Sequence, residues 1–275
     1  MLIEALVGGK HRDLLAPHFS FEQLRPGNVV ETDLFRQIAA LRYEVYCLEC
    51  RYLNPEDYPR QVEIDDYDER SAHAAARNSD CQIVGTMRLV QATANQRYPF
   101  EEHCTVFDDF VFPPREQCGE VSRLVVLKSF RRRPGDSMQG ITKEFQERGS
   151  PGAIVPAMQR KPGRERRSNS PEILLGLYRE IFRFSRQAGI RYWFAAMEQP
   201  LARSLSRMGF DFNPIGPETD YYGPVTPFMA DLDELQANLQ KQNPLLLAWF
   251  NDRSISPWLL FRTWLKMKFA TAGKP

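Results

Sequence analysis

Apolar residues recur at helical spacing early in the chain. Between residues 33 and 52 they stand three or four positions apart, at Leu34, Ile38, Leu41, Val45 and Leu48. This spacing is typical of a buried helix face, and Thr32 or Asp33 can serve as the N-cap, so we predict a helix over 33–52. Arg42 and Tyr46 lie four residues apart and therefore share one face of this helix.

Alternating apolar and polar residues predict strands in the next part of the chain. The segments 71–77 and 82–92 are joined by a turn-forming Asn-Ser-Asp and are expected to form a hairpin. The segment 119–128 reads GEVSRLVVLK and is rich in β-branched and apolar residues. We predict a central strand here, whose side chains at even positions near its start, Glu120 and Ser122, face a functional site.

The second half of the chain returns to a helical pattern and then alternates. A helix is expected over 171–189, because a proline stands at its start and a glycine at its end. A strand at 191–197, a short helix at 201–208 and a further strand from 210 towards 224 follow it. This order of helices and strands predicts a mixed α/β sheet rather than two layers of helices.

Composition narrows the possible partners and compartments. Lys and Arg number 36 and Asp and Glu 35 among 275 residues, so no overall charge favours nucleic acid. No apolar run reaches the ~18 residues of a membrane span and the N-terminus lacks a signal-peptide pattern, so we expect a cytoplasmic protein. Five cysteines include one C-x-x-C pair, Cys47 and Cys50, with no second pair or histidine pair to match it, so we expect no metal site.

Two segments carry local positive charge. Residues 128–168 contain eleven basic and four acidic residues, a net charge of +7, and residues 241–275 carry a net charge of +5 with three of the four tryptophans. The tail either contacts a membrane surface as an interfacial helix or docks on the domain or on a dimer partner. We expect an N-terminal extension over 1–30, a catalytic domain over 31–243 with a basic insertion at about 129–170, and an amphipathic basic and aromatic tail over 244–275.

Arginines and carboxylates gather on separate predicted elements. The arginines are Arg42, Arg88 and Arg123, and the carboxylates are Asp65, Asp68 and Glu120. Buried charges are costly unless they are paired. Paired in a cleft, they can hold a zwitterion, with its ammonium on the carboxylates and its carboxylate or lactone oxygen on an arginine. His73 stands beside them, either as a base or, as we favour, as a hydrogen-bonded structural residue.

The same residues form an ordered series of motifs. The series reads Arg42-x-x-x-Tyr46, Glu63-x-Asp65-x-x-Asp68, Gly85-x-x-Arg88-Leu89 and Glu120-x-Ser122-Arg123. In this order and at these separations it resembles the signature of acyl-homoserine-lactone (autoinducer) synthases. Tyrosine at position 46 looks more like the related N-acyl amino acid synthases. A further tryptophan of the autoinducer synthases has no counterpart near residues 50–54, where Tyr52 is the one stand-in.

Motifs in the second half carry a narrower resemblance. They are Leu174-x-Gly176-Leu177-Tyr178, Ala196-Met197-Glu198-x-Pro200-Leu201-Ala202, Met208-Gly209-Phe210 and Asp220-Tyr221-Tyr222-Gly223. They resemble the acyltransferase associated with bacterial PEP-CTERM/exosortase systems, itself a relative of the synthases.

The resemblance implies an α/β fold of the GNAT-like (acyl-CoA N-acyltransferase) class. Its mixed central sheet would splay between two central strands, here 120–128 and 191–197, and be flanked by helices. An acyl thioester would enter the splay, with its carbonyl oxygen on a backbone N–H near residues 123–125. An attacking amine must lose a proton, so we expect a carboxylate as general base, Glu120 first and Asp65 second.

The remaining site residues follow from the same resemblance. Arg123 would act with these carboxylates, and the acceptor would be held by Arg42, Tyr46, Asp68, Arg88 and Ser122. The acyl chain would run into an apolar pocket, for which the sequence offers Phe100, Phe107, Phe110 and Phe112 as lining.

The donor is predicted from charge. Arg132-x-x-Gly135-x-Ser137 approximates the pyrophosphate loop of CoA-dependent GNAT enzymes, so Arg132 and Gly135 are the candidate cofactor-binding residues, although Pro134 interrupts the loop. Acyl carrier protein (ACP) is strongly acidic and the basic insertion offers a surface for it, which favours acyl-ACP over acyl-CoA as co-substrate, with no tightly bound cofactor.

These expectations combine into one function and three alternatives. We expect an N-acyltransferase that moves a long-chain acyl group from acyl-ACP, or from acyl-CoA, to the α-amine of an amino acid or a similar small amine. The alternatives are a catalytically silent GNAT-like module that binds acyl-ACP or a lipid, an acyl-homoserine-lactone synthase, and an acetyl-CoA-dependent N-acetyltransferase.

Overall fold

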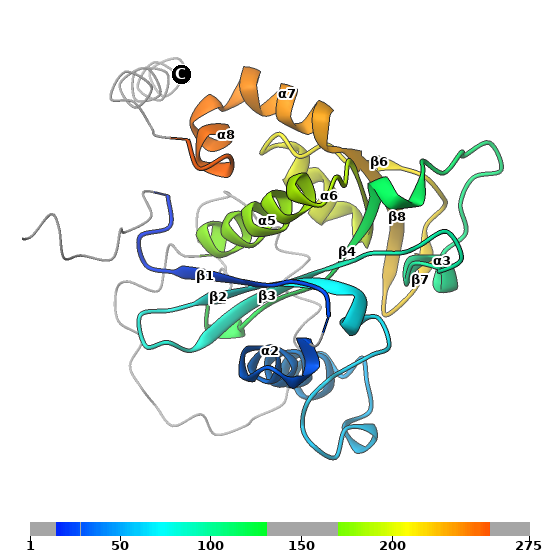
Figure 1. Cartoon of the computed structure of the whole chain (residues 1–275). Coiled ribbons are helices and arrows are strands. Elements are labelled where there is room, and N and C mark those ends of the chain that lie inside the picture. Colours follow the sequence, from blue (N-terminus) through cyan, green and yellow to red (C-terminus); the bar gives the residue numbers. More distant parts are fainter. Residues whose placement is uncertain (1–14, 28, 131–169, 254–275) are drawn as a thin grey trace, which may run out of the picture.

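The computed structural model describes residues 15–27, 29–130 and 170–253 (Figure 1). Most of the predicted basic insertion lies outside these ranges, with Arg132 and Gly135, and so does the tail from residue 254 onward. In the described ranges, no helix has the length and apolar character needed to cross a membrane.

The strands form a mixed sheet in the order β1-β2-β3-β4-β5-β8-β6, with β7 pairing on β8. Their bounds are β1 (Ser20–Leu24), β2 (Ser71–Arg77), β3 (Ile83–Val90), β4 (Cys118–Val126), β5 (Tyr192–Met197), β6 (Asn213–Pro214), β7 (Thr219–Asp220) and β8 (Pro224–Asp231). Among these strands, β4 and β5 form the one parallel pair, and the predicted hairpin is β2 with β3.

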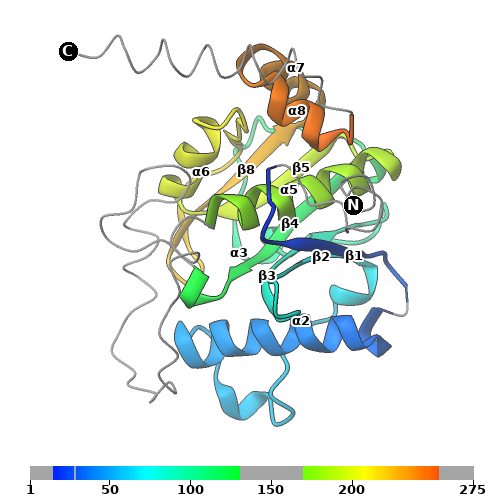
Figure 2. The ribbon, with the colours of Figure 1, turned by 90° about the vertical axis from the view of Figure 1, so that its left-hand side faces the viewer.

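Helices cover both faces of the sheet. They are α2 (Asp33–Tyr43), α3 (Phe100–His103), α5 (Ser170–Gln187), α6 (Gln199–Ser206), α7 (Leu232–Gln242) and α8 (Pro244–Phe250). Figures 1 and 2 show α2 on one face and α5 on the other, and we name the faces after these helices. On the α2 face Leu41 shares a buried cluster with Val125, whereas on the α5 face Leu177 shares one with Val121 and Val126.

The two central strands separate soon after they meet. Their pairing consists of Cys118 with Tyr192, Gly119 with Trp193, and Glu120 with Phe194. Beyond that point β4 continues to Val126 and β5 to Met197 without pairing to each other. The predicted mixed sheet, splayed between these two strands and flanked by helices, is therefore confirmed.

A β-bulge interrupts β4 at its centre. Thr86 of β3 pairs with Val125 and Arg88 pairs with Ser122, so the single residue between them opposes both Arg123 and Leu124. Arg123 has a φ of 50°, a left-handed conformation that is uncommon outside glycine. The bulge removes Arg123 and Leu124 from regular pairing and shifts the alternation of side chains by one residue. For this reason Val125, an odd-numbered residue like Val121, faces the opposite side of the sheet.

Two predicted elements differ from the structure. The helix expected over 33–52 is α2 followed by a π-helical turn, η2 (Glu44–Glu49). The strand expected from residue 210 is wrong, because that region forms only the two-residue strands β6 and β7 before the long strand β8 begins at Pro224. Prolines 214, 217 and 224 interrupt it, and a proline has no N–H to donate to a neighbouring strand.

Both ends of the described chain contribute to the domain. Ser20–Leu24, which the sequence analysis assigned to the N-terminal extension, pairs with β2 as the edge strand β1. At the other end, Trp249 and Phe250 of α8 are buried in the main core. Asp252 accepts a hydrogen bond from Arg179 of α5 and lies 2.5 Å from Arg183. Residues 244–253 thus dock on α5, whereas the rest of the predicted amphipathic tail, from residue 254, lies outside the described residues.

We predict that Phe250→Leu lowers the free energy of unfolding by about 1–2 kcal/mol, because the smaller side chain leaves a gap against the rings of Phe182 and Phe210. Urea denaturation followed by circular dichroism measures this. Phe107→Leu is the matched control, since Phe107 is 44% exposed, and it should change the free energy by less than about 0.5 kcal/mol. Equal effects of the two substitutions would contradict the docking of α8.

Candidate active site

Six charged side chains form a closed ring of ion pairs on the α2 face of the sheet. Three arginines alternate with three carboxylates, and we call the set the charged ring: Arg42, Asp68, Arg88, Asp65, Arg123 and Glu63. They come from α2, from the loop before β2, from β3 and from β4. Three positive and three negative charges cancel, so the ring is neutral as a whole.

Arg42 joins the two most buried carboxylates. Its Nε donates to Glu63, and its Nη1 and Nη2 donate to the two oxygens of Asp68 at 2.7 and 3.1 Å. Burial alone would raise the pKa of Asp68, but the guanidiniums of Arg42 and Arg88 outweigh it and hold that pKa well below its usual range. Burial would also raise the pKa of Glu63, but the charges of Arg42 and Arg123 outweigh burial and lower this pKa. Both carboxyls are therefore ionised at neutral pH.

Arg88 and Arg123 close the ring through Asp65. Arg88 Nη1 lies 2.9 Å from Asp68 and 2.5 Å from Asp65, and its Nε donates to Ser122 Oγ at 3.0 Å. Arg123 Nη2 donates to Asp65 at 2.8 Å and to Glu63 at 2.9 Å. The side chains of Asp65 and Arg123 keep 23% and 19% exposure, whereas the other four are at most 1% exposed. A ligand can therefore reach the ring along the edge formed by Asp65 and Arg123.

A cavity of about 240 Å³ opens where β4 and β5 separate. It is lined on the α2 face by Tyr46 and Cys50, and on the α5 face by Leu174, Tyr178 and Leu201. Consecutive residues of β4 (120–126) and of β5 with the start of α6 (195–198) also line it, so the edges of both strands face the space. The cavity thus passes through the sheet.

Two carboxylates line this cavity, Glu198 and Glu120, and Glu120 adjoins Ser122 and Arg123 along β4. The Glu120 side chain is 3% exposed and accepts a hydrogen bond from the backbone N–H of Phe100 at 2.9 Å. Burial raises the pKa of Glu120 to about 8, although the Phe100 N–H and the charges of Arg88 and Arg123 oppose the shift. A carboxyl with this pKa can both take and return a proton near neutral pH.

Comparison with known proteins identifies the fold that carries this site. Residues 41–139 match the family described as "Acetyltransferase (GNAT) domain". The structure is similar to TofI in a ternary complex with an inhibitor and MTA, with a TM-score of 0.54, 14% identity, and coverage of 82% of this chain and 99% of TofI. It is similar to BjaI, a CoA-dependent acyl-homoserine lactone synthase (TM-score 0.54, 19% identity, 81% and 89% covered), and to the AHL synthase LasI (0.52, 16%, 82% and 95%). No curated protein matches the sequence.

The fold is the GNAT fold. Residues 41–139 match the model of the GNAT acetyltransferase domain, and the solved acyl-homoserine-lactone synthase structure of BjaI has a similar fold. The recognised domain includes the whole charged ring together with Glu120 and the bulge in β4. The likeness to the solved structures is longer than this segment, since it covers 81–82% of the chain.

Four of the eight predicted catalytic and acceptor-binding residues line the cavity. Tyr46, Glu120, Ser122 and Arg123 line it, whereas Arg42, Asp65, Asp68 and Arg88 do not. The second group lies behind the first. Arg88 holds Ser122, and Asp65 holds Arg123, so these two residues support the cavity wall.

Aromatic residues surround the mouth of the cavity on the α2 face. The guanidinium of Arg123 lies 5.4 Å from the ring centre of Tyr46, and Tyr52 lies between Tyr46 and Tyr222, 6.3 and 5.6 Å away. Tyr221, next in contact, also lines the cavity. Neither Tyr221 nor Tyr222 was predicted as a site residue from the sequence. Their position near Tyr52 depends on how β7 and β8 pack in the folded protein.

The phenylalanines expected to line the acyl pocket lie elsewhere. Phe100, Phe110 and Phe112 pack around Phe194 in a separate buried cluster, and Phe107 is 44% exposed. None of the four lines the cavity, so this prediction is wrong. The segment that carries them has no regular spacing from which the direction of each ring could be deduced.

The structure defines the roles of one further member of the charged ring, Glu63, and of one neighbour, His73. Glu63 was noted in the motif but not named as a site residue, and it proves to bridge Arg42 and Arg123. His73 is 1% exposed, its Nε2 lies 3.2 Å from the backbone oxygen of Asp68, and burial lowers its pKa to about 4. It is therefore neutral at pH 7 and away from the cavity, which fits the structural role favoured from the sequence.

We predict that Glu120 makes folding sensitive to pH. Between about pH 4.5 and pH 8 the folded protein keeps the Glu120 proton that the unfolded chain releases, so its contribution to stability is complete below this window and is lost as pH rises through it. The expected loss is about 2–4 kcal/mol. Glu120→Gln cannot ionise and should be more stable than the wild type at pH 9 but not at pH 4. Urea denaturation at both pH values tests this, and an unchanged difference would count against it.

Proposed function

We propose that this GNAT-fold protein is an N-acyltransferase that joins an acyl group from a thioester to the amine of a small acceptor. The observation that carries the proposal is the cavity through the sheet, which has Glu120 beside Ser122 and Arg123 in its wall and apolar walls on the α5 face. A thioester carbonyl placed between β4 and β5 would meet an amine from the α2 face, while its acyl chain extends toward α5.

Glu120 is proposed to move the proton. Its carboxylate takes a proton from the acceptor ammonium, directly or through water, and the amine lone pair then attacks the thioester carbonyl carbon. The negative charge that develops on the carbonyl oxygen would be stabilised by backbone N–H groups of the bulge at Arg123 and Leu124. The carbon–sulfur bond breaks as the carbonyl re-forms, and the thiolate takes up the proton that Glu120 holds. The nitrogen of the adduct loses its second proton to water, so the products are an amide, a free thiol and one proton released to the solvent.

The exposed edge of the charged ring is proposed to hold the acceptor. Asp65 offers a carboxylate to an ammonium and Arg123 offers a guanidinium to a carboxylate, which suits the zwitterion of an amino acid. Tyr46 and Ser122 would contact the same molecule, and Asp65 is the second candidate for the base. Arg42, Asp68 and Arg88 would act by holding this edge in place.

The donor is proposed to be a long-chain acyl-ACP, with acyl-CoA as the alternative. The acidic surface of ACP suits the basic insertion, whereas Arg132 and Gly135 are the residues proposed to bind the pyrophosphate of CoA. Among similar structures, BjaI is described as CoA-dependent and has been solved with SAM and isopentyl-CoA. The motifs of the second half support an N-acyl amino acid synthase of the PEP-CTERM-associated type, and the tail after residue 253 is the segment proposed to contact a membrane surface.

Mass spectrometry tests the proposal directly. The purified full-length protein is incubated with acyl-ACPs and acyl-CoAs of several chain lengths and with each amino acid, and lipid extracts of expressing cells are compared with those of control cells. A new acylated amine supports the proposal. Retention of every thioester in vitro, with no new amide in cells, would instead favour a silent acyl-binding module. S-adenosylmethionine is included as an acceptor, and a lactone product would identify an acyl-homoserine-lactone synthase.

A further inference from the structure

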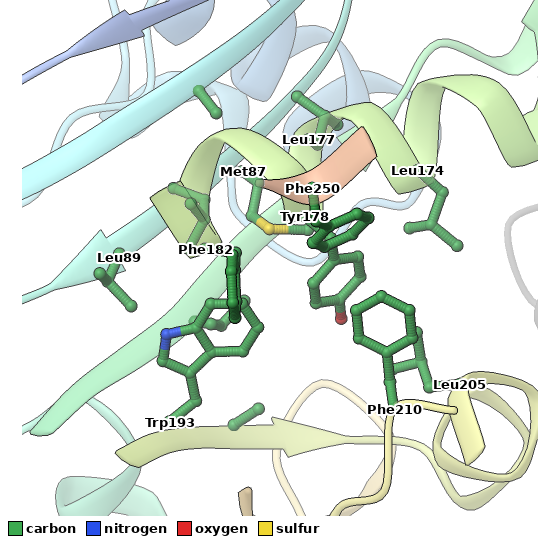
Figure 3. Packing of buried hydrophobic residues seen from close by; sticks show 14 of the residues in the cluster. Met87, Leu89, Leu174, Leu177, Tyr178, Phe182, Trp193, Leu205, Phe210 and Phe250 are labelled. Carbon is green, nitrogen blue, oxygen red and sulfur yellow. The ribbon is translucent and has the colours of Figure 1, made fainter. Parts of the chain in front are cut away.

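The carboxyl of Glu120 is in direct contact with the short helix α3. Side chains alternate between the two faces along β5: Figure 3 shows Trp193 in the core with Tyr178 of α5, 6.0 Å away, so Phe194 faces the other way. Phe194 pairs with Glu120 across the two central strands, and its ring centre lies 5.1 Å from that of Phe100. Phe100 is the first residue of α3, and its backbone N–H donates to Glu120. The position of α3 therefore determines how this N–H meets the proposed base.

A bidentate ion pair fixes the start of α3. Arg115 Nη1 and Nη2 donate to the two carboxylate oxygens of Glu101 at 2.9 and 2.7 Å. Glu101 also accepts from the backbone N–H of Tyr98 at 2.7 Å, and the Tyr98 hydroxyl donates to the backbone oxygen of Arg115 at 3.2 Å. The side chains of Glu101 and Arg115 keep only 10% and 23% exposure, so water competes little for the pair. A bidentate pair restricts orientation as well as distance, and this one holds the backbone on both sides of Phe100.

The ion pair and the hydrogen bond to Glu120 join the same two segments. Arg115 belongs to the helical turn η5 (Arg115–Gln117), which leads directly into β4, the strand that carries Glu120. Glu101 follows Phe100 in α3. Because both contacts connect α3 with the start of β4, each limits the movement that would break the other. Loss of the ion pair is therefore expected to weaken the hydrogen bond from Phe100.

Several titratable groups face Glu120 and act on its pKa in opposite directions. Burial raises this pKa, whereas the N–H of Phe100 and the charges of Arg88 and Arg123 lower it, and the charge of Glu101 raises it. Arg115 neutralises Glu101, so it limits the last of these effects. The other neighbours are uncharged at neutral pH because burial raises the pKa of each, and they are Tyr67, Tyr98, Cys104 and Tyr221.

We infer that Arg115 is a positioning residue for the proposed base: through Glu101 it holds the N–H of Phe100 against the carboxyl of Glu120. The inference deepens the proposed function and rests on it for its catalytic consequence. The hydrogen bond from Phe100 favours the ionised carboxylate, so the ion pair keeps more of Glu120 ready to accept a proton at neutral pH. Neither Arg115 nor Glu101 lines the cavity, and both act through Phe100.

The pH dependence of unfolding tests the inference without requiring turnover. Urea denaturation of the full-length protein is measured between about pH 5 and pH 10, with and without Glu120→Gln, in the wild type and in Arg115→Met. The stability of each protein relative to its Glu120→Gln counterpart falls as pH rises and levels off at the pKa of Glu120 in the folded state. In the wild type this point should lie at about pH 8. In Arg115→Met it should lie about half to one pH unit higher, as the loss of one hydrogen bond allows.

Arg115→Lys separates position from charge. Lysine keeps the positive charge beside Glu101 but cannot form the bidentate pair. The inference requires a shift to higher pH in both Arg115 variants. A shift in Arg115→Met alone would mean that the charge of unpaired Glu101 acts on Glu120 directly, and it would overturn the inference. The absence of a shift in either variant would overturn it as well.

Arg36→Met is the control, because Arg36 is 65% exposed on α2 and its loss changes the net charge by the same amount as Arg115→Met. It should leave the levelling point unchanged. If the wild type transfers acyl groups, the rise of its rate with pH should move upward in both Arg115 variants. If the wild type transfers none, the proposed function fails, whereas the unfolding measurement still decides whether Arg115 positions the N–H of Phe100.

Discussion

Replacing Glu120 by Gln is expected to lower kcat/KM for acyl transfer by about 10²- to 10⁴-fold, the range typical of a lost general base. Glutamine keeps the size of the side chain and can still accept the hydrogen bond from Phe100 N–H. It cannot take a proton from the acceptor. Because the buried carboxyl titrates near pH 8, the wild-type rate should rise with pH through that value, and the variant should lack this rise.

The matched control for this prediction is Glu116→Gln. Glu116 lies just before β4 and is exposed, so its substitution makes the same chemical change from Glu to Gln without touching the cavity. Steady-state rates of both variants, with the best donor and acceptor found by mass spectrometry, make the comparison. If Glu120→Gln keeps more than about a tenth of wild-type activity, the base is another group, and Asp65→Asn becomes the next variant to measure.

Replacing Arg42 by Met is expected to lower the free energy of unfolding by about 3–5 kcal/mol. Arg42 is completely buried and holds Glu63 and Asp68, so its removal leaves a net negative charge inside the protein. The methionine fills part of the volume but supplies no hydrogen bond to either carboxylate. Chemical denaturation at neutral pH measures the loss.

Arg36→Met on the same helix provides the control. Arg36 is 65% exposed and pairs with Asp33, an arrangement that contributes little, so the expected change is within about 0.5 kcal/mol. A loss below about 1 kcal/mol for Arg42→Met would show that the ring tolerates an unpaired carboxylate. The ring would then not be what stabilises the α2 face.

Much of this fold follows from the spacing of apolar residues. The hairpin, the central strand, the helix over 171–189 and the strand over 191–197 were predicted close to their bounds because each is long and regular. The bulge at Arg123 was not, since nothing in the sequence distinguishes a residue with positive φ from its neighbours in an apolar strand. Edge strand β1 was missed because pairing with β2, rather than its own pattern, defines it.

The sequence predicts most of the residues that belong to the site, but it does not predict how their side chains are arranged around the cavity. Motif order selected the three arginines together with Asp65 and Asp68, and the cost of burying unpaired charge correctly implied that these pair. The third carboxylate of the ring is Glu63 and not Glu120, which instead accepts a hydrogen bond from the backbone of Phe100. Which of them reach the cavity depends on differences in burial, such as that between Arg88 at 1% exposure and Arg123 at 19%, that are fixed only by packing. The apolar residues that line the cavity are harder still to predict from the sequence, because one apolar residue can replace another in a pattern. As a lining residue, Phe112 is as plausible from the sequence as Leu174.

The passage of the cavity through the sheet bears on the order of events in a reaction between two substrates. Under the proposed function, a carrier-bound donor approaches the gap between β4 and β5 from one side of the protein and a small acceptor from the other, so neither blocks the entrance of its partner. Sequential kinetics without competition between substrates would follow. The product, however, joins a head group on one side to a chain on the other and must be drawn through a gap bounded by two strand edges. Its departure, rather than bond formation, is then the step that longer chains would slow.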